Sequence, residues 1–167
     1  SMLISGPVRL GMANSPYSPS LWINSYQNNR STIIYMPSLL DEVGKWCLPI
    51  LGLTATGNLT TFSWNRTLLA LTGPVIPIDV WAHVVVTYHT QSQLQLILNG
   101  THSNNLDIMN YISSGQPNHL IVGSVVWRAD CAGFEMIKGH YHGAIDDLRL
   151  YSRQLTDGEI RNLAHRP

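Results

Sequence analysis

The 167-residue chain carries little charge of either sign. Lysine, arginine, aspartate and glutamate together make up 12% of it, the formal net charge is zero, and the ten basic residues are scattered without a run. Proteins that bind nucleic acid or an anionic membrane through charge need a basic patch, so neither is predicted as a partner. Long apolar runs are missing too. Residues 80–88 fit a buried strand at most, so no membrane insertion is predicted.

Acidic residues that could form a catalytic pair are also few. Glycosidic cleavage needs two carboxylates that flank the scissile bond, yet the chain has only three glutamates, Glu42, Glu135 and Glu159. Asp146 and Asp147 are neighbours, and neighbours in an extended strand point to opposite faces. Neither a Gly-x-Ser-x-Gly nucleophile motif nor a glycine-rich phosphate loop is present. The sequence therefore predicts a protein that is not an enzyme.

What the sequence does contain is a series of short strand patterns. Runs of β-branched and aromatic residues alternate with clusters of Gly, Pro, Asn and Ser, which favour turns. Strands are predicted at residues 8–12, 20–24, 32–36, 46–54, 59–64, 81–89, 93–98, 120–123 and 143–151. Many short strands with almost no helix indicate an all-β, antiparallel sandwich.

The middle of the chain gives the clearest register. In residues 81–89 the alternate positions from Ala82 to Tyr88 share one face, and in residues 93–98 the three leucines share one face. This period of two is that of a strand with one buried side. The dipeptide Asn99-Gly100 then predicts a tight turn into an adjacent strand.

The last third of the chain joins a strand to a short helix. In residues 143–151, strict alternation places Asp146 on the same face as Leu148 and Leu150, which predicts an acid on a mostly apolar face. A buried carboxylate must be paired, hydrogen-bonded or metal-bound. Thr156 and Glu159 form a capping-box pattern, which predicts one or two helical turns packed on the sandwich.

These patterns together resemble a known family. Residues 143–160 resemble the closing motif of laminin-G-like domains of the concanavalin A-like lectin/glucanase superfamily. Residues 81–100 are similar to the central hairpin of these domains, residues 20–24 and 32–35 to their early strand pair, and residues 120–123 to the strand before their variable loop. The resemblance runs from about residue 8 to residue 163. It implies an antiparallel jelly-roll β-sandwich with one short C-terminal helical turn, formed by residues 3–167 as a single domain after a two-residue cloning remnant, Ser1-Met2.

The resemblance implies a non-catalytic extracellular recognition module. Carbohydrate binding by loops at one end of the sandwich is the leading prediction, with a glycan as partner. The alternative is a protein–protein adhesion module of a larger secreted or cell-surface protein, and a third possibility is an accessory domain that orients a hydrolase. Because a fold does not fix function, the ligand class rests on analogy with the family.

The predicted ligand site lies in the variable segment 124–139. Loops on a rigid sandwich often carry function, and a sugar site needs an apolar platform with a few polar groups. Trp127 is predicted to stack on a sugar ring, while Arg128 and Asp130 hydrogen-bond its hydroxyl groups. In the other interpretation, Trp127 folds back over the sandwich edge and Cys131 pins the loop.

Two metal sites are considered. Laminin-G-like and pentraxin-like relatives often bind calcium at a sheet rim, which makes Asp146 the candidate ligand, with Asp107 and Asp130 in loops. The alternative is that Asp146 holds backbone N–H groups near a bulge. His140 and His142 share one face with a spacing that can serve zinc, but Cys131 would have to be the third ligand.

Three further observations concern the compartment and His83. Four N-glycosylation sequons begin at Asn29, Asn58, Asn65 and Asn99. Together with the family resemblance they favour secretion, an extracellular or cell-surface location, and a disulfide between Cys47 and Cys131. Two unpaired buried cysteines are the alternative. His83 is expected to order the central hairpin and not to catalyse.

Overall fold

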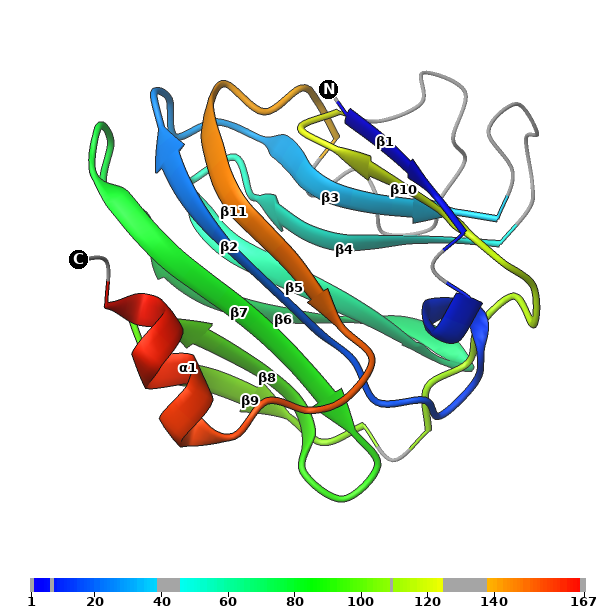
Figure 1. Ribbon diagram of the computed structural model, residues 1–167. Coiled ribbons are helices and arrows are strands. Elements are labelled where there is room, and N and C mark those ends of the chain that lie inside the picture. The colour runs from blue at the N-terminus through cyan, green and yellow to red at the C-terminus, as the bar shows by residue number, and fades with distance from the viewer. Residues whose placement is uncertain (1, 7, 39–45, 109, 125–137, 166–167) are drawn as a thin grey trace.

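The computed structural model describes residues 2–6, 8–38, 46–108, 110–124 and 138–165. Within these residues it contains eleven strands, one 3₁₀ helix and one α-helix. The strands form two antiparallel sheets that pack face to face (Figure 1). The predicted all-β, antiparallel sandwich with one short C-terminal helix is confirmed.

The first sheet has six strands in the order β1-β10-β3-β4-β5-β6. Their bounds are β1 Met2–Ser5, β10 His119–Val122, β3 Ser31–Pro37, β4 Cys47–Leu53, β5 Asn58–Asn65 and β6 Thr67–Val75. The second sheet has five strands in the order β11-β2-β7-β8-β9. Their bounds are β11 Gly143–Tyr151, β2 Ser18–Ser25, β7 Trp81–His89, β8 Gln93–Leu98 and β9 Thr101–Leu106. Met2, which the sequence analysis assigned to a cloning remnant, is the first residue of β1 and pairs with Val122 of β10.

Most of the predicted strands are present, and one strand prediction is wrong. Residues 8–12 were expected to be a strand, but Val8–Gly11 form a 3₁₀ helix, η1. This turn buries Leu10 and brings the backbone of Gly11 so close to Gln116 that an added Cβ would lie 1.9 Å from the Gln116 carbonyl oxygen.

The three strands whose bounds the sequence did not predict are all at sheet edges. β1 and β6 are the outer strands of the first sheet, and β9 is an outer strand of the second. An edge strand needs little apolar alternation, because neighbouring strands do not enclose it on both sides. β9 is accordingly polar from Thr101 to Asn105, and β6 contains Gly73 and Pro74.

The core lies between the two sheets and follows the predicted register of the central hairpin. Ala82, Val84, Val86 and Tyr88 are at most 1% exposed and pack in the main hydrophobic cluster with the leucines of β8. Asn99 and Gly100 have positive φ values of 50° and 76°. Positive φ at both positions is typical of the tight turn that joins adjacent strands, so this turn prediction is confirmed.

The two edges of the sandwich differ. At the β6–β9 edge the sheets are tied together, because Asn104 Nδ2 donates to the Thr72 carbonyl oxygen at 2.9 Å. At the opposite edge, the outer strands β1 and β11 are not hydrogen-bonded to each other, and a groove lies there. β11 contains a bulge between Asp146 and Arg149, which disrupts the hydrogen-bonding pattern of this exposed edge strand.

The C-terminal helix, α1 (Asp157–Ala164), covers part of the outer face of the second sheet. Its capping box is confirmed: the Thr156 side chain accepts from the Glu159 N–H, and the Glu159 side chain accepts from the Thr156 N–H. Ile160 packs in a small cluster with Val85 and Ile97. Among the residues that the structure describes, no helix has the length and apolar character to cross a membrane.

Loss of the capping hydroxyl should weaken this helix measurably. We expect Thr156→Ala to lower the free energy of unfolding by about 1 kcal/mol, because the first turn loses a hydrogen-bond acceptor for its free N–H groups. Thr156→Ser keeps the hydroxyl and should cost much less. Urea unfolding of both variants tests this. Equal destabilisation by serine and alanine would show that the cap contributes nothing.

Candidate functional site

The loop between β10 and β11 is held at both ends by β3. Gly123, just after β10, donates from its N–H to the carbonyl of Ile33 at 2.8 Å. On the returning side, the Thr32 N–H donates to the carbonyl of Gly139 at 3.0 Å. Thr32 and Ile33 are neighbours in a strand that is buried along its whole length. The two ends of the loop are therefore fixed side by side on a rigid support.

Side chains reinforce these anchors. Ser124 Oγ lies 2.8 Å from His140 Nδ1, which joins the two ends of the loop directly. Gly139 has a φ of +145°, and a Cβ at this position would lie 2.7 Å from the carbonyl oxygen of Arg30. A side chain at residue 139 would therefore push the returning segment away from β3.

The residues predicted to bind a sugar, Trp127, Arg128 and Asp130, lie outside the described residues. The choice between a stacking platform and a folded-back plug therefore stays a prediction. Cys131 also lies outside them. Cys47 is 6% exposed, and no cysteine among the described residues is free, but the bond between Cys47 and Cys131 stays a prediction.

Next to the loop anchors, a groove of about 560 Å³ runs along the β1–β11 edge. Its apolar wall includes Val122, Tyr141 and Ile145, and its acidic rim is formed by Asp146 and Asp147. Asp147 also accepts a hydrogen bond from Arg149 Nε at 2.8 Å. The groove thus combines an apolar wall with an acidic rim, and Arg149 partly compensates the negative charge of that rim.

The prediction that Asp146 shares an apolar face with Leu148 and Leu150 is wrong. The β-bulge after Asp146 inserts an extra residue, so that Ile145 packs with both leucines against the core and Asp146 is exposed. Asp147 takes a positive φ of 50° at the bulge. Asp146 Oδ1 accepts from the Asp147 N–H at 2.8 Å. This is the alternative role considered above, a carboxylate that holds a backbone N–H group at a bulge.

The predicted calcium and zinc sites stay predictions, because each includes residues outside the described part of the chain. The described residues contain no group of three or more His, Cys, Asp and Glu side chains placed to hold a metal ion. Asp107 accepts a hydrogen bond from Gln93, the first residue of β8, which pairs with the last residue of β7. Asp146 pairs with Trp22 of β2, which pairs with His83 near the start of β7. The two aspartates therefore lie toward opposite ends of the second sheet. His140 and His142 are both exposed. A site that uses Asp130 or Cys131 lies outside the described residues and stays a prediction.

His83 lies buried on the outer face of the second sheet, where its side chain contacts β2 and its backbone contacts the turn of the central hairpin. His83 is 1% exposed, and its ring Nε2 lies 2.9 Å from Ser20 Oγ. The backbone N–H of His83 donates to Asn99 Oδ1 at 2.9 Å. Burial lowers the pKa of His83 from 6.5 to about 4. The Ser20–His83 contact joins β2 to β7, and both side chains are buried.

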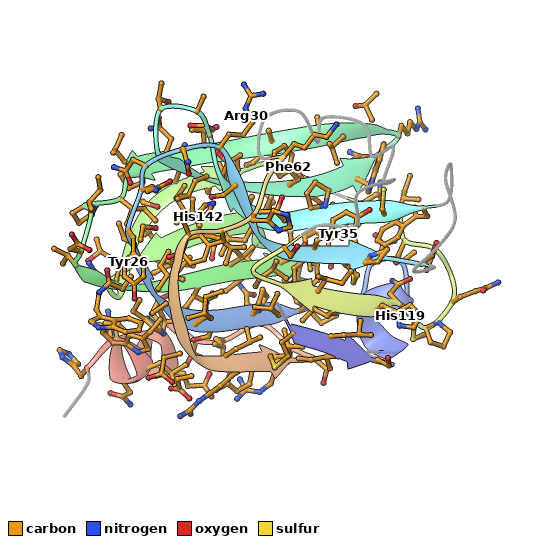
Figure 2. The ribbon with its side chains drawn as sticks, turned by 90° about the horizontal axis from the view of Figure 1, so that it is seen from above. Tyr26, Arg30, Tyr35, Phe62, His119 and His142 are labelled. Carbon is orange, nitrogen blue, oxygen red and sulfur yellow. The ribbon has the colours of Figure 1, made fainter. Side chains whose placement is uncertain are left out.

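Sequence reasoning missed one group of exposed side chains. Tyr26 is 55% exposed and Trp81 is 37% exposed at the end of the sandwich where β2 ends and β7 begins. Figure 2 shows Tyr26 near His142, and the Tyr26 N–H donates to the His142 carbonyl at 2.9 Å. Trp81 is the first residue of β7, and a tryptophan at a strand terminus gives no local signal of its exposure.

A family model described as the concanavalin A-like lectin/glucanases superfamily matches residues 4–161. The chain therefore belongs to this superfamily, and the resemblance seen in the sequence is confirmed. A search of curated proteins gave no match.

Several solved structures share the fold. Domain 4 of AbnA, an extracellular GH43 arabinanase from Geobacillus stearothermophilus, in complex with arabinotriose, is 22% identical, with a TM-score of 0.66 over 98% of this chain and 72% of that chain. The Ruminococcus gnavus IT-sialidase CBM40 bound to α2,3-sialyllactose is 13% identical, with a TM-score of 0.72 over 90% and 83%. A SAP-like pentraxin from Limulus polyphemus is 16% identical, with a TM-score of 0.64 over 96% and 72%.

Proposed function

We propose that this chain is a non-catalytic, extracellular carbohydrate-binding domain. The observation that carries the proposal is the match over most of the chain to two domains whose structures hold a bound saccharide, arabinotriose in one and sialyllactose in the other. The anchored loop supports it, because a rigid frame lowers the entropic cost of ordering a binding loop. Trp127, Arg128 and Asp130 are the residues that we propose contact the sugar.

Three of the described carboxylates bond to neighbouring side chains, which supports a role without catalysis. Glu159 bonds to Arg153 at 2.6 Å, Asp157 to His102 at 3.0 Å, and Asp147 to Arg149 at 2.8 Å. These groups are committed to neighbouring side chains of the domain itself. A glycosidase needs instead two carboxylates that face each other across a substrate. Glu42, Glu135 and Asp130 lie outside the described residues.

Exposure of two sequons supports an extracellular location. Asn29 and Asn99 are exposed, while Asn58 and Asn65 are only partly so. Asn58 Nδ2 already donates to the carbonyl of Gly73 at 3.0 Å. The proposed disulfide between Cys47 and Cys131 would suit the same oxidising compartment.

A glycan array followed by calorimetry tests the proposal. We expect specific saccharide binding by the folded domain and a loss of affinity of more than about tenfold in Trp127→Ala, because a stacked aromatic side chain contributes more than 1 kcal/mol. Ile112→Ala, which removes a 42% exposed apolar side chain elsewhere, is the matched control. Each titration is repeated in calcium and in a chelator, since binding lost in chelator would show that saccharide binding needs a metal ion. A folded domain that binds no saccharide would contradict the proposal.

A further inference from the structure

A β-bulge in β9 brings two polar side chains to the same face of the second sheet. His102 and Asn105 are three positions apart, so strict alternation would place them on opposite faces. The register between β8 and β9 shifts at Ser103, which is the extra residue of the bulge. His102 pairs with Ile97 and Asn105 pairs with Gln95, and these two partners in β8 share one face. Because Ile97 packs against α1, His102 and Asn105 lie on the outer face, beside the helix (Figure 1).

A pocket of about 410 Å³ lies at this bulge. Its lining is polar and consists of amides, a hydroxyl group and one imidazole: Gln95, His102, Ser103, Asn104 and Asn105. These five residues all belong to the described part of the chain, and the volume lies within the range of small-molecule sites. Because β9 and β11 are the two outer strands of the second sheet, the pocket lies at the edge opposite the groove beside β11.

Two of the lining side chains are fixed through one atom and keep another free. Thr87 Oγ1 donates to Gln95 Oε1 at 3.2 Å, and the Gln95 NH₂ group has no partner among the described residues. His102 Nε2 lies 3.0 Å from Asp157 Oδ1. Since a carboxylate only accepts, Nε2 carries the hydrogen, and Nδ1 of the neutral imidazole is an acceptor. The Asn105 amide, which can both donate and accept, bonds to no described side chain. The pocket therefore offers donors and acceptors that the described chain does not use.

The charged groups around the pocket favour an uncharged ligand. Asp157 contacts His102, and Asp107, just past the end of β9, accepts a hydrogen bond from Gln93. The guanidinium of Arg161, one turn along α1, attracts Asp157, and its side chain lies beside the turn before β9. Also engaged with neighbours are Arg153, Glu159 and His89. An anion would meet two carboxylates, and a cation would compete with the hydrogen bonds that both of them already make.

The free groups of the pocket match the hydroxyl groups of a sugar. A hydroxyl group both donates and accepts, so adjacent hydroxyl groups can bond to the Gln95 donor, the His102 acceptor and the Asn105 amide. Gln95 and Asn105 are directly opposite, with Cβ atoms about 5 Å apart, which one sugar ring can span. The His102 side chain is 44% exposed and offers a flat ring face. The described lining has no apolar side chain, so hydrogen bonds must supply most of the affinity. A dissociation constant on the order of 1 mM is therefore expected.

We infer that the pocket at the β9 bulge is a second saccharide site, which takes one neutral sugar residue through its adjacent hydroxyl groups. This inference rests on the proposed carbohydrate-binding function. It adds a weak second contact at the β9 edge, so that a surface carrying many copies of the same sugar is held at two points of one domain.

Side-chain amide signals in nuclear magnetic resonance spectra test this site directly. The isotopically labelled whole chain is titrated with the methyl glycosides of galactose, glucose and arabinose, and with N-acetylneuraminic acid as an anionic probe. We expect at least one neutral glycoside to shift the NH₂ signals of Gln95 and Asn105 saturably, and the anion to leave them in place. Asn105→Ala should weaken this binding about fivefold, read from the Gln95 signal. Gln95→Leu, read from the Asn105 signal, gives an independent second measure. Asn110→Ala, which alters an exposed asparagine outside the pocket lining, should leave the binding unchanged.

The possible results separate this inference from the proposed function. If no glycoside shifts the two amide signals, while the domain binds a glycan on the array and loses it in Trp127→Ala, the second site is overturned and the proposed function stands. Saturable shifts that neither Asn105→Ala nor Gln95→Leu weakens would also overturn the second site. Binding of N-acetylneuraminic acid that equals or exceeds that of the neutral glycosides would contradict a neutral ligand. A folded domain that binds no saccharide in either measurement would overturn both.

Discussion

Replacing Gly143 by alanine should strongly destabilise the domain. A Cβ at this position would lie 2.3 Å from the Asn24 carbonyl oxygen and 2.6 Å from Tyr141 Oη. Neither group can easily move, because Asn24 is part of β2 and Tyr141 Oη accepts from the buried Ser25 Oγ. Overpacking against fixed backbone commonly costs 1–3 kcal/mol, and we expect a loss of about 3 kcal/mol or more here.

Gly158→Ala is the matched control and should act in the opposite direction. Gly158 lies in the first turn of α1, and an added Cβ would have no neighbour within 4 Å. Alanine restricts the unfolded chain and favours the helix, so stability should rise by about 0.5–1 kcal/mol. Urea unfolding followed by circular dichroism measures both variants. Similar stability of Gly143→Ala and the wild type would show that β11 and β2 are not as close as the structure places them.

Acidification should destabilise the domain through His83. The pKa of His83 falls from 6.5 in the unfolded chain to about 4 in the folded protein, mainly because the imidazole is buried. The charged groups nearest to it, Asp147 and Arg149, act in opposite directions. Between pH 6.5 and pH 4 the unfolded chain therefore binds a proton that the folded protein does not. Stability should fall by about 3 kcal/mol as the pH drops through this range.

Glu159 titrates at lower pH, and its effect on stability must be separated from that of His83. Hydrogen bonds from Arg153 and from the Thr156 cap lower the pKa of Glu159 from 4.5 to about 2. Its stabilising effect is present above pH 4.5 and is lost as the pH falls toward 2. The slope of unfolding free energy between pH 6.5 and 4.5 therefore reports His83. That slope should flatten in His83→Gln. An unchanged slope in this variant would show that His83 is not the group responsible.

The sequence predicted the interior strands well because their burial leaves a periodic signal. Alternation from Ala82 to Tyr88 and the pair Asn99-Gly100 are set by local backbone geometry, and both are present as expected. The capping box at Thr156 is equally local. The bounds of the edge strands β1, β6 and β9 were not predicted because these strands lack this alternation. Residues 8–11 form a turn that brings Gly11 against the backbone of Gln116, which is distant in the sequence.

The candidate site depended more on tertiary structure. The family and the variable loop were evident from motif order, but the role of Asp146 was not, because one extra residue at a bulge reverses which side chains face the core. The exposure of Tyr26 and Trp81 is likewise decided by contacts distant in sequence. Tyr26 is fixed by His142 and Trp81 pairs with Asn24.

By itself, the sequence determined the fold class, the central hairpin and the capped helix, since each follows from short-range geometry and burial period. It also indicated the family, through the order of motifs that resemble those of the superfamily. The tertiary structure alone decided which strands form edges, where the bulge in β11 falls, and which aromatic side chains meet solvent around the end of β2. The bulge in β11 and the exposure around the end of β2 involve pairing between residues more than fifty positions apart, such as Trp22 with Asp146 and Asn24 with Trp81. No local pattern encodes such a pairing, because its free energy comes from packing that exists only once both sheets have formed.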